Sequence, residues 1–246
     1  MRAKLKGHFT DDSASVSLNL PEYFTDFEIK GSCRGFILFC RSLNIYLWNP
    51  STGLHKQIPF SPFGSNIDAT FFYGFGYDHS TDDYLVVSMS YHDSDDTQLH
   101  LEYFSLKSNT WKEVEAPHFC YIFAYGPKRG CLYNGAIHWL AYRYDLHLHV
   151  IVSFDLMERK LSYMHLPHDS YGNPLQWGGL WVYGEFLSIY TKNYRNDTFE
   201  IWVMKEYKVK TSWTMTLVLP LDLRSKVTMY IDSLLLLPGD GDNKPD

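Results

Sequence analysis

The stretch YLWNPSTGLHKQIP (46–59) reads as a short strand, a tight turn and a second strand, and the chain repeats this plan three more times. The other copies are EYFSLKSNTWKEV (102–114), IVSFDLMERKLSYMHLP (151–167) and EIWVMKEYKVKTSW (200–213). In each copy a turn separates two runs rich in aromatic and β-branched residues, which are typical of strands. The copies therefore predict a repeat protein built from antiparallel strands.

The spacing of the copies decides the fold class. The steps between equivalent points are 56, 50 and 50 residues, with those points taken as Asn49, Ser105, Asp155 and Lys205. A repeat of about 50 residues made of strands and turns is typical of propeller blades and not of a doubly wound sheet. We therefore expect an all-β fold, a kelch-like β-propeller or a propeller-derived array of antiparallel sheets, with about four visible repeats and a partial fifth.

The remainder of each unit also reads as strands. GFILFC (35–40) is an apolar run of strand length, and FFYGFGYDHSTDDYLVVSMSY (71–91) reads as a hairpin. Asn134–Gly135 is a strong signal for a two-residue turn, because both residues tolerate positive φ. No segment of 12 residues keeps a helical period, so we expect little helix.

These units predict one β-propeller-like domain over residues 1–238. Its repeats span about 31–60, 71–117, 130–167 and 180–220. SWTMTLVLP (212–220) and SLLLLP (233–238), which follow the fourth closing phrase, are expected to begin a further, incomplete unit. The polar tail, 239–246, is expected to be disordered.

Composition and charge exclude several functions. The formal net charge is −6 and no block of Lys or Arg exceeds a pair, whereas a nucleic-acid-binding protein carries a basic stripe. The N-terminus has no apolar stretch typical of a secretory signal, and no run approaches the 18 apolar residues of a membrane span. We expect an intracellular protein, cytoplasmic or nuclear or both, that binds neither nucleic acid nor membrane.

Four cysteines stand at irregular spacing without a Cys-x-x-Cys pair: Cys33, Cys40, Cys120 and Cys131. This pattern is too sparse for a disulfide framework in a chain of 246 residues and lacks the paired spacing of a zinc site. Free thiols are expected, and no metal or other cofactor is predicted.

Three pairs of adjacent carboxylates are candidates for acid–base chemistry: Asp11–Asp12, Asp82–Asp83 and Asp95–Asp96. All lie in predicted turns, where Asp stabilises the turn by accepting hydrogen bonds from nearby backbone N–H groups. The sequence DHSTDD around Asp82 also lacks the Gly and the terminal Glu of an EF-hand calcium loop. We therefore interpret these pairs as turn residues.

Histidines offer a weaker candidate for a metal site. His147 and His149 would lie on one face of a strand, and the other nearby histidines in the sequence are His138, His165 and His168. No third ligand is fixed by spacing, so surface or cross-strand roles are favoured.

Catalytic motifs are also lacking. The sequence has no Gly-x-Ser-x-Gly elbow, and Gly74-x-Gly76 lies in a hairpin without a following helix. We predict no catalytic residue, and the chain is not expected to be an enzyme.

Aromatic residues recur near the closing strands, at Trp48, Trp111, Trp139, Trp202 and Trp213. Packing between blades is the favoured interpretation, because large rings bury much area, and a surface anchor for a partner is the alternative. Loops are the expected place for partner contacts: HDSDDTQ (92–98), RYDLHLH (143–149), HDSYGNPLQWGG (168–179) and KNYRNDT (192–198). No individual partner-binding residue is predicted.

Five strings in this order resemble the F-box-associated domain of the plant F-box/kelch-repeat family, which includes S-locus F-box proteins. They are GSCRGFILFC with LWNPSTGLHKQIP, then FGYDHSTDDYLVV, YFSLKSNTW, NGAIHWLA with IVSFDL, and EIWVMKEYKVKTSW, which together span about residues 31–213. The F-box helices that precede this domain in the family are absent from the sequence.

The resemblance implies that the chain is the substrate-recognition part of an SCF-type E3 ubiquitin ligase receptor. Its partner would be a protein destined for ubiquitination, and a Skp-family adaptor would bind only if an F-box lies upstream. One alternative is a stand-alone interaction or scaffold module without adaptor binding. A propeller with lectin-like or enzymatic activity is the other.

Overall fold

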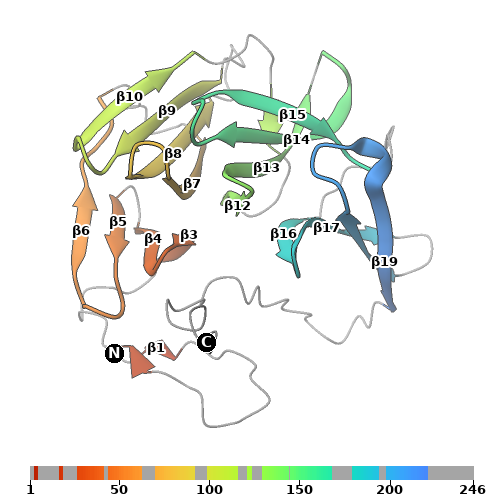
Figure 1. Cartoon of the computed structure of the whole chain (residues 1–246), viewed down its shortest axis with the longest axis horizontal. Helices are drawn as coiled ribbons and strands as arrows, with labels where there is room; N and C mark the ends of the chain where they lie inside the picture. Colours follow the sequence, from red (N-terminus) through yellow and green to blue (C-terminus); the bar gives the residue numbers. More distant parts are fainter. Residues whose placement is uncertain are drawn as a thin grey trace, which may run out of the picture. The chain divides into compact units, whose positions relative to one another are not determined.

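The computed structural model describes residues 3–4, 17–18, 27–41, 44–62, 70–91, 99–115, 121–123, 129–143, 145–167, 179–193 and 198–220. Within these ranges every regular element is a strand except η1, a single 3₁₀ turn (Lys210–Ser212). Four antiparallel sheets of propeller-blade type account for nearly all of the strands (Figure 1). The predicted all-β class and the expectation of little helix are confirmed.

Each sheet is a meander in which strands that follow one another in sequence pair side by side. The first sheet contains β3 (Glu28–Cys33), β4 (Phe36–Arg41), β5 (Asn44–Trp48) and β6 (His55–Ile58). The second contains β7 (Thr70–Asp78), β8 (Asp83–Tyr91), β9 (His100–Ser105) and β10 (Thr110–Val114).

The third sheet has a divided inner strand, since β11 (Tyr121–Phe123) and β12 (Cys131–Tyr133) pair with opposite ends of β13. Its other strands are β13 (Ala136–Arg143), β14 (Leu148–Asp155) and β15 (Leu161–His165). The fourth sheet contains β16 (Gly179–Tyr183), β17 (Phe186–Asn193), β18 (Thr198–Met204) and β19 (Trp213–Pro220). A separate two-residue pairing joins β1 (Ala3–Lys4) to β2 (Ser17–Leu18).

One sequence assignment is wrong. SWTMTLVLP (212–220) does not begin a fifth unit, because Trp213–Pro220 is β19 and pairs with β18 as the last strand of the fourth sheet. The connection before it, 205–212, is longer than the corresponding turns of the other sheets and contains η1, which delayed the strand relative to the repeat. SLLLLP (233–238) and the tail 239–246 lie outside the described residues.

The chain divides into two compact units. One contains the first sheet, whose core joins Ile37, Phe39 and Trp48. The other, Ser61–Val227, contains the second, third and fourth sheets.

Within this larger unit the third sheet has a core on each face. Toward the second sheet the buried residues include Leu85, Val87, Met89, Leu101, Ile137, Trp139, Val152 and Phe154. Toward the fourth sheet they include Ile151, Leu187, Ile189, Met204 and Trp213. Within this unit each sheet therefore buries an apolar face against its neighbour, as the repeat predicted.

The inner strands of the second and third sheets approach so closely that glycine is required. The Gly130 N–H donates to the carbonyl of Tyr73 at 2.7 Å. A Cβ atom on Gly74 would lie 2.5 Å from Cγ2 of Ile137 and 2.7 Å from Cζ2 of Trp139. Both neighbours are buried core residues, so a side chain at position 74 would displace them.

The connections of each sheet lie at two opposite ends of its strands. Because neighbouring strands are antiparallel, the first and third connections of a sheet lie at the same end of its strands, which we call the turn edge. The second connection lies at the opposite end of the strands, which we call the loop edge. The β12–β13 connection at the turn edge is Asn134–Gly135 with φ of 47° and 71°, which confirms the predicted two-residue turn.

Candidate functional site

A buried carboxylate, Asp78, organises the turn edge of the second sheet. It lies at the end of β7 and accepts hydrogen bonds from the Ser80 N–H at 2.8 Å, the Ser80 hydroxyl at 2.7 Å and the Thr81 hydroxyl at 2.7 Å. Nη2 of Arg159 donates at 2.6 Å to Oδ2, the oxygen that also accepts from Thr81, whereas both Ser80 donors use Oδ1. Burial alone would raise the pKa of Asp78, but these hydrogen bonds outweigh it and hold the pKa well below its usual range.

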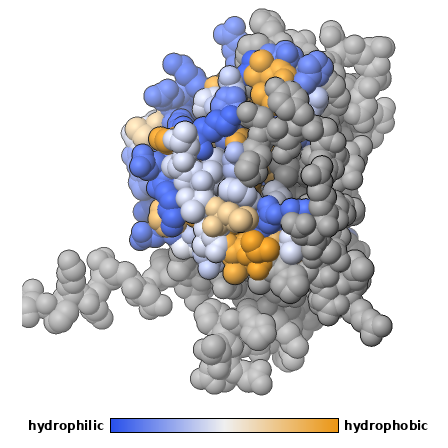
Figure 2. All heavy atoms as spheres, turned by 90° about the vertical axis from the view of Figure 1, so that its right-hand side faces the viewer, coloured by the Kyte–Doolittle hydropathy of each residue, from blue (hydrophilic) through white to orange (hydrophobic). Residues whose placement is uncertain are grey.

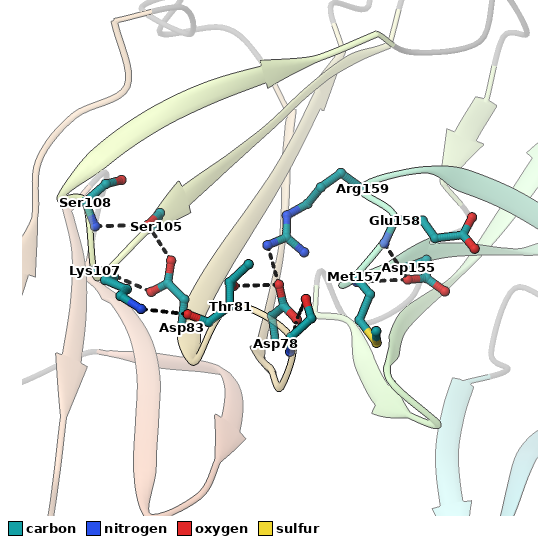
Figure 3. Close-up of polar contacts among 11 residues, drawn as sticks. Asp78, Thr81, Asp83, Ser105, Lys107, Ser108, Asp155, Met157, Glu158 and Arg159 are labelled. Atoms are coloured by element: carbon teal, nitrogen blue, oxygen red, sulfur yellow. Dashed lines mark hydrogen bonds and ion pairs between the residues drawn. The ribbon is translucent and has the colours of Figure 1, made fainter.

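The contact with Arg159 joins two sheets, because Arg159 lies in the β14–β15 turn of the third sheet. Its guanidinium also lies over the ring of Tyr103 in β9, 5.1 Å from the ring centroid. Figure 3 shows Arg159 pointing across from one ribbon to the Asp78 turn of the other. The turn edges of the second and third sheets are thus tied by an ion pair and a cation–π contact.

A second carboxylate, Asp83, connects the two turns within the second sheet. It accepts a hydrogen bond from the Ser105 hydroxyl and another from the Lys107 N–H, the latter at 2.8 Å. Nζ of Lys107 donates to the Thr81 carbonyl at 2.8 Å (Figure 3). The contacts of Asp83 and Lys107 therefore hold the β7–β8 and β9–β10 turns to each other.

The adjacent carboxylates Asp82 and Asp83 do not act on a common proton. Asp82 accepts a hydrogen bond from the hydroxyl of Tyr77, whereas Asp83 faces Ser105. The structure therefore places this pair in turn-stabilising roles. Asp11–Asp12 and Asp95–Asp96 lie outside the described residues.

Three of the four equivalent points of the repeat have side chains that accept hydrogen bonds from backbone N–H groups of the turn that follows. Asn49 accepts from residues 51 and 52, and Asp155 accepts from residues 157 and 158. The Ser105 hydroxyl accepts from the N–H of residue 108 at 3.1 Å. Lys205 cannot accept, and in the fourth sheet Ser212 fills this role for the N–H of Glu206 at 3.0 Å.

A neutral polar cluster joins the third and fourth sheets. The fully buried His138 hydrogen-bonds the Tyr207 hydroxyl through Nε2 at 2.8 Å and the Cys131 carbonyl through Nδ1 at 3.1 Å. The Tyr133 hydroxyl donates to the Glu185 carbonyl at 2.9 Å. These contacts bring the β16–β17 and β18–β19 turns against β12 and β13.

Burial sets the protonation states in this cluster. It lowers the pKa of His138 to about 4 and raises the pKa of Tyr207 to about 12, with Asp155 and Tyr133 adding to the latter. Burial also raises the pKa of the Cys131 thiol to about 12. At neutral pH the three groups are therefore uncharged, so the imidazole serves as a structural hydrogen-bonding group.

The other predicted histidines have different neighbours. His147 lies 3.4 Å from the Tyr142 hydroxyl, and His149 packs edge-on against the Tyr142 ring on the adjacent strand. The ring of His165 contacts Tyr163 on β15. Residue 168 lies outside the described ranges, and among the described residues no group of three potential ligands could hold a metal ion.

The tryptophans mainly serve packing. Trp139 belongs to the core between the second and third sheets, and Trp202 and Trp213 belong to the next core. Trp48 is buried in the first sheet, and Trp111 packs against Phe104 in the second.

The structure describes only part of the loops predicted to bind a partner. Residues 92–98, 168–178 and 194–197 lie outside the described residues. In the described part of 143–149, Nε and Nη2 of Arg143 form a bidentate ion pair with Asp145, each at 2.8 Å. The Arg143 guanidinium also lies 4.3 Å from the ring centroid of Tyr163. This loop is thus pinned to the outer strand β15.

The described residues include free thiols and polar contacts between turns. Their free cysteines include Cys40 and Cys131, and burial raises the pKa of both thiols to about 12, so neither is an activated nucleophile. No helix in the described part of the chain is long and apolar enough to cross a membrane. The polar contacts that we find join turns and sheets, which makes the turn edge a pre-organised surface.

The fold and this surface define the class as an all-β propeller-type protein with fixed turns between blade sheets. Residues 1–240 match the family described as the F-box associated beta propeller domain, and the chain belongs to this family. The expected resemblance is confirmed.

Related proteins from Arabidopsis thaliana carry F-box names. F-box protein CPR1 is 32% identical over 210 residues, which cover 76% of this chain and 51% of that protein. F-box protein At4g22390 is 27% identical, covering 81% and 57%, and F-box/kelch-repeat protein At3g23880 is 25% identical, covering 79% and 53%. The chain therefore spans about half the length of the curated relatives it matches.

Among solved structures, dipeptidyl peptidase 4 of Porphyromonas gingivalis is similar with a TM-score of 0.45 and 8% identity, over 75% of this chain and 31% of that one. A likeness of this size says nothing about peptidase activity.

Proposed function

We propose that this chain is a protein-recognition module that holds a target protein for ubiquitination by an SCF-type ligase. The observation that carries the proposal is the family match over residues 1–240, together with relatives named as F-box proteins. The chain itself forms and breaks no covalent bond, and ubiquitin transfer takes place on the target while the module holds it. A Skp-family adaptor takes part where the complete protein carries an F-box, and the setting is the cytoplasm, the nucleus or both.

The geometry supports binding over catalysis. Asp78, Asp83 and His138 are buried among turn and strand groups that use their hydrogen-bonding capacity. An acid or base in a hydrolytic site must reach a substrate, whereas these groups hold the turns in place. Fixed turns lower the entropic cost of binding, because less ordering is needed when a partner docks.

A gain-of-function experiment tests the proposal. The F-box half of CPR1 is fused before Met1, and proteins crosslinked to the full chain in plant cells are identified by mass spectrometry. We expect the fusion to increase ubiquitination of a captured protein and to shorten its half-life in a cullin-dependent manner. The matched control is the same fusion with Gly74→Leu, which disrupts packing between the second and third sheets. Captured proteins whose ubiquitination and half-life are the same with both fusions would contradict the proposal.

A further inference from the structure

The outer strand of the fourth sheet exposes an unusual amount of apolar surface. Four large hydrophobic residues in β19 and the turn before it are at least a third exposed: Val209 (38%), Met215 (47%), Leu217 (39%) and Val218 (46%). Figure 2 views the molecule from the side on which β19 lies in Figure 1, and hydrophobic surface is exposed there among polar residues. Apolar residues exposed along one outer strand mark that strand as a candidate interaction site.

The exposed side chains lie on both faces of the sheet. Met215 is opposite Trp202 and Val218 is opposite Glu200, so both project on one face. Leu217 is opposite Ile201 and projects on the other, because the register shifts between Ile201 and Trp202. A partner that packed on one face would leave the other uncovered. An added strand would cover both.

The edge of β19 also lacks the charges that usually protect an outer strand. Natural edge strands are often blunted by Lys and other charged residues. In this protein β6 exposes Lys56 and β10 exposes Lys112 and Glu113, whereas β15, like β19, contains no Lys, Arg, Asp or Glu. No charged residue occurs in β19, and no strand of the described residues pairs with its outer edge.

Charge at one end of β19 indicates the direction of an added strand. The turn that leads into β19 carries three exposed lysines, Lys205, Lys208 and Lys210, against one exposed acid, Glu206, in a chain of net charge −6. Every strand pair in the four sheets is antiparallel. An added antiparallel strand would finish beside Trp213, next to these lysines, so acidic residues at its C-terminal end would be favoured.

We propose that β19 is the docking edge for an extended segment of the target, apolar along its length and acidic at its C-terminal end, which adds to the fourth sheet as an antiparallel strand. Backbone hydrogen bonds supply the affinity, while the apolar side chains and the lysines select the sequence. This inference rests on the proposed function, since it names the surface and the segment by which the target is held.

The test measures binding of a defined peptide to the full chain. The probe is a short fluorescent peptide of alternating valine and threonine that ends in glutamates, followed by fluorescence anisotropy. We expect Met215→Lys and Leu217→Lys each to weaken binding about tenfold, because a charged side chain opposes strand addition. Met157→Lys is the matched control, since Met157 is 60% exposed on the β14–β15 turn, and its affinity should remain within about twofold of the parent.

A charge exchange tests the direction. Lys208→Glu should weaken binding of the glutamate-ended peptide about threefold, the size expected for an exposed ion pair. A peptide that ends in lysines should bind Lys208→Glu more tightly than it binds the parent chain. If Lys208→Glu changes the affinity for both peptides equally, the antiparallel direction of the added strand is overturned.

Other occupants of the edge give different results. If Met215→Lys and Leu217→Lys convert a dimer to a monomer in light scattering without changing peptide affinity, β19 pairs with a second copy and the proposal is overturned. If they lower the unfolding temperature as core substitutions do, the chain itself covers the edge, and the proposal fails again. Absence of peptide binding to the parent chain also overturns it. These assays contain no adaptor or ubiquitin, so their failure is separate from failure of the ligase function.

Discussion

Arg159 and Asp78, 81 residues apart in sequence, form a 2.6 Å ion pair that joins the turn edges of the second and third sheets. The Asp78 side chain is fully buried, and that of Arg159 is 20% exposed. Removal of either partner leaves the other with an unmet charge in a poorly solvated position. The pair therefore adds a contact at the turn edge to the apolar packing and the Gly130–Tyr73 backbone hydrogen bond that also join the two sheets.

Arg159→Ala should lower the free energy of unfolding by about 2 kcal/mol, because Asp78 would keep its turn hydrogen bonds but lose its counter-ion. Urea denaturation followed by tryptophan fluorescence measures the change. Lys160→Ala, at an exposed neighbouring position, should change stability by less than about 0.5 kcal/mol. Similar values for both variants would show that the ion pair does not stabilise the fold.

Local turn chemistry could be predicted from the sequence, because acceptor and donors lie within a few residues. Asn49 and Asp155 occur at equivalent points of the repeat, and each side chain accepts hydrogen bonds from backbone N–H groups of the turn that follows. Lys205 stands at the fourth such point but has no acceptor oxygen. The longer turn there uses Ser212, and this difference explains why β19 was assigned to a further unit.

Contacts between sheets could not be predicted in the same way. His138 and Tyr207 are 69 residues apart, and no spacing rule selects Tyr207 among 19 tyrosines. The docking edge was also missed, because WTMTLVLP reads equally well as a buried strand. The sequence did carry one signal. The segment WTMTLVLP contains no charged residue, although it stands where a repeat ends on an outer strand.

Gly74→Ala should destabilise the protein by about 2 kcal/mol, since the new Cβ would overlap Ile137 and Trp139 in the core between two sheets. Thermal unfolding by circular dichroism measures this effect. Gly135→Asn is the control, because Gly135 has a φ of 71° with open space around it, and Asn tolerates that conformation. The prediction fails if Gly74→Ala unfolds at the temperature of the parent chain.

Tyr207→Phe should cost about 1 to 3 kcal/mol, because it removes the hydroxyl that pairs with Nε2 of the fully buried His138. Tyr183→Phe, which removes the hydroxyl of a tyrosine that is 47% exposed, should be nearly neutral. Chemical denaturation of both variants gives the comparison. Equal stability losses would show that the buried hydrogen bond of Tyr207 stabilises the fold no more than the exposed hydroxyl of Tyr183 does.

His138 should also make stability depend on pH. Burial lowers its pKa from 6.5 to about 4 in the folded protein, so between these values the unfolded chain binds a proton that the folded chain does not. The free energy of unfolding should therefore fall as the pH falls through this window, by about 3 kcal/mol in total from this group. His100 acts in the opposite direction, because hydrogen bonding to Glu102 raises its pKa and its contribution to stability is lost as the pH rises.

The His138 contribution is isolated by comparing the stability of the parent with that of His138→Gln at each pH. We expect the stability difference between them to shrink from pH 7 to pH 4. A difference that stays constant over this range would mean that His138 titrates alike in the folded and unfolded chain.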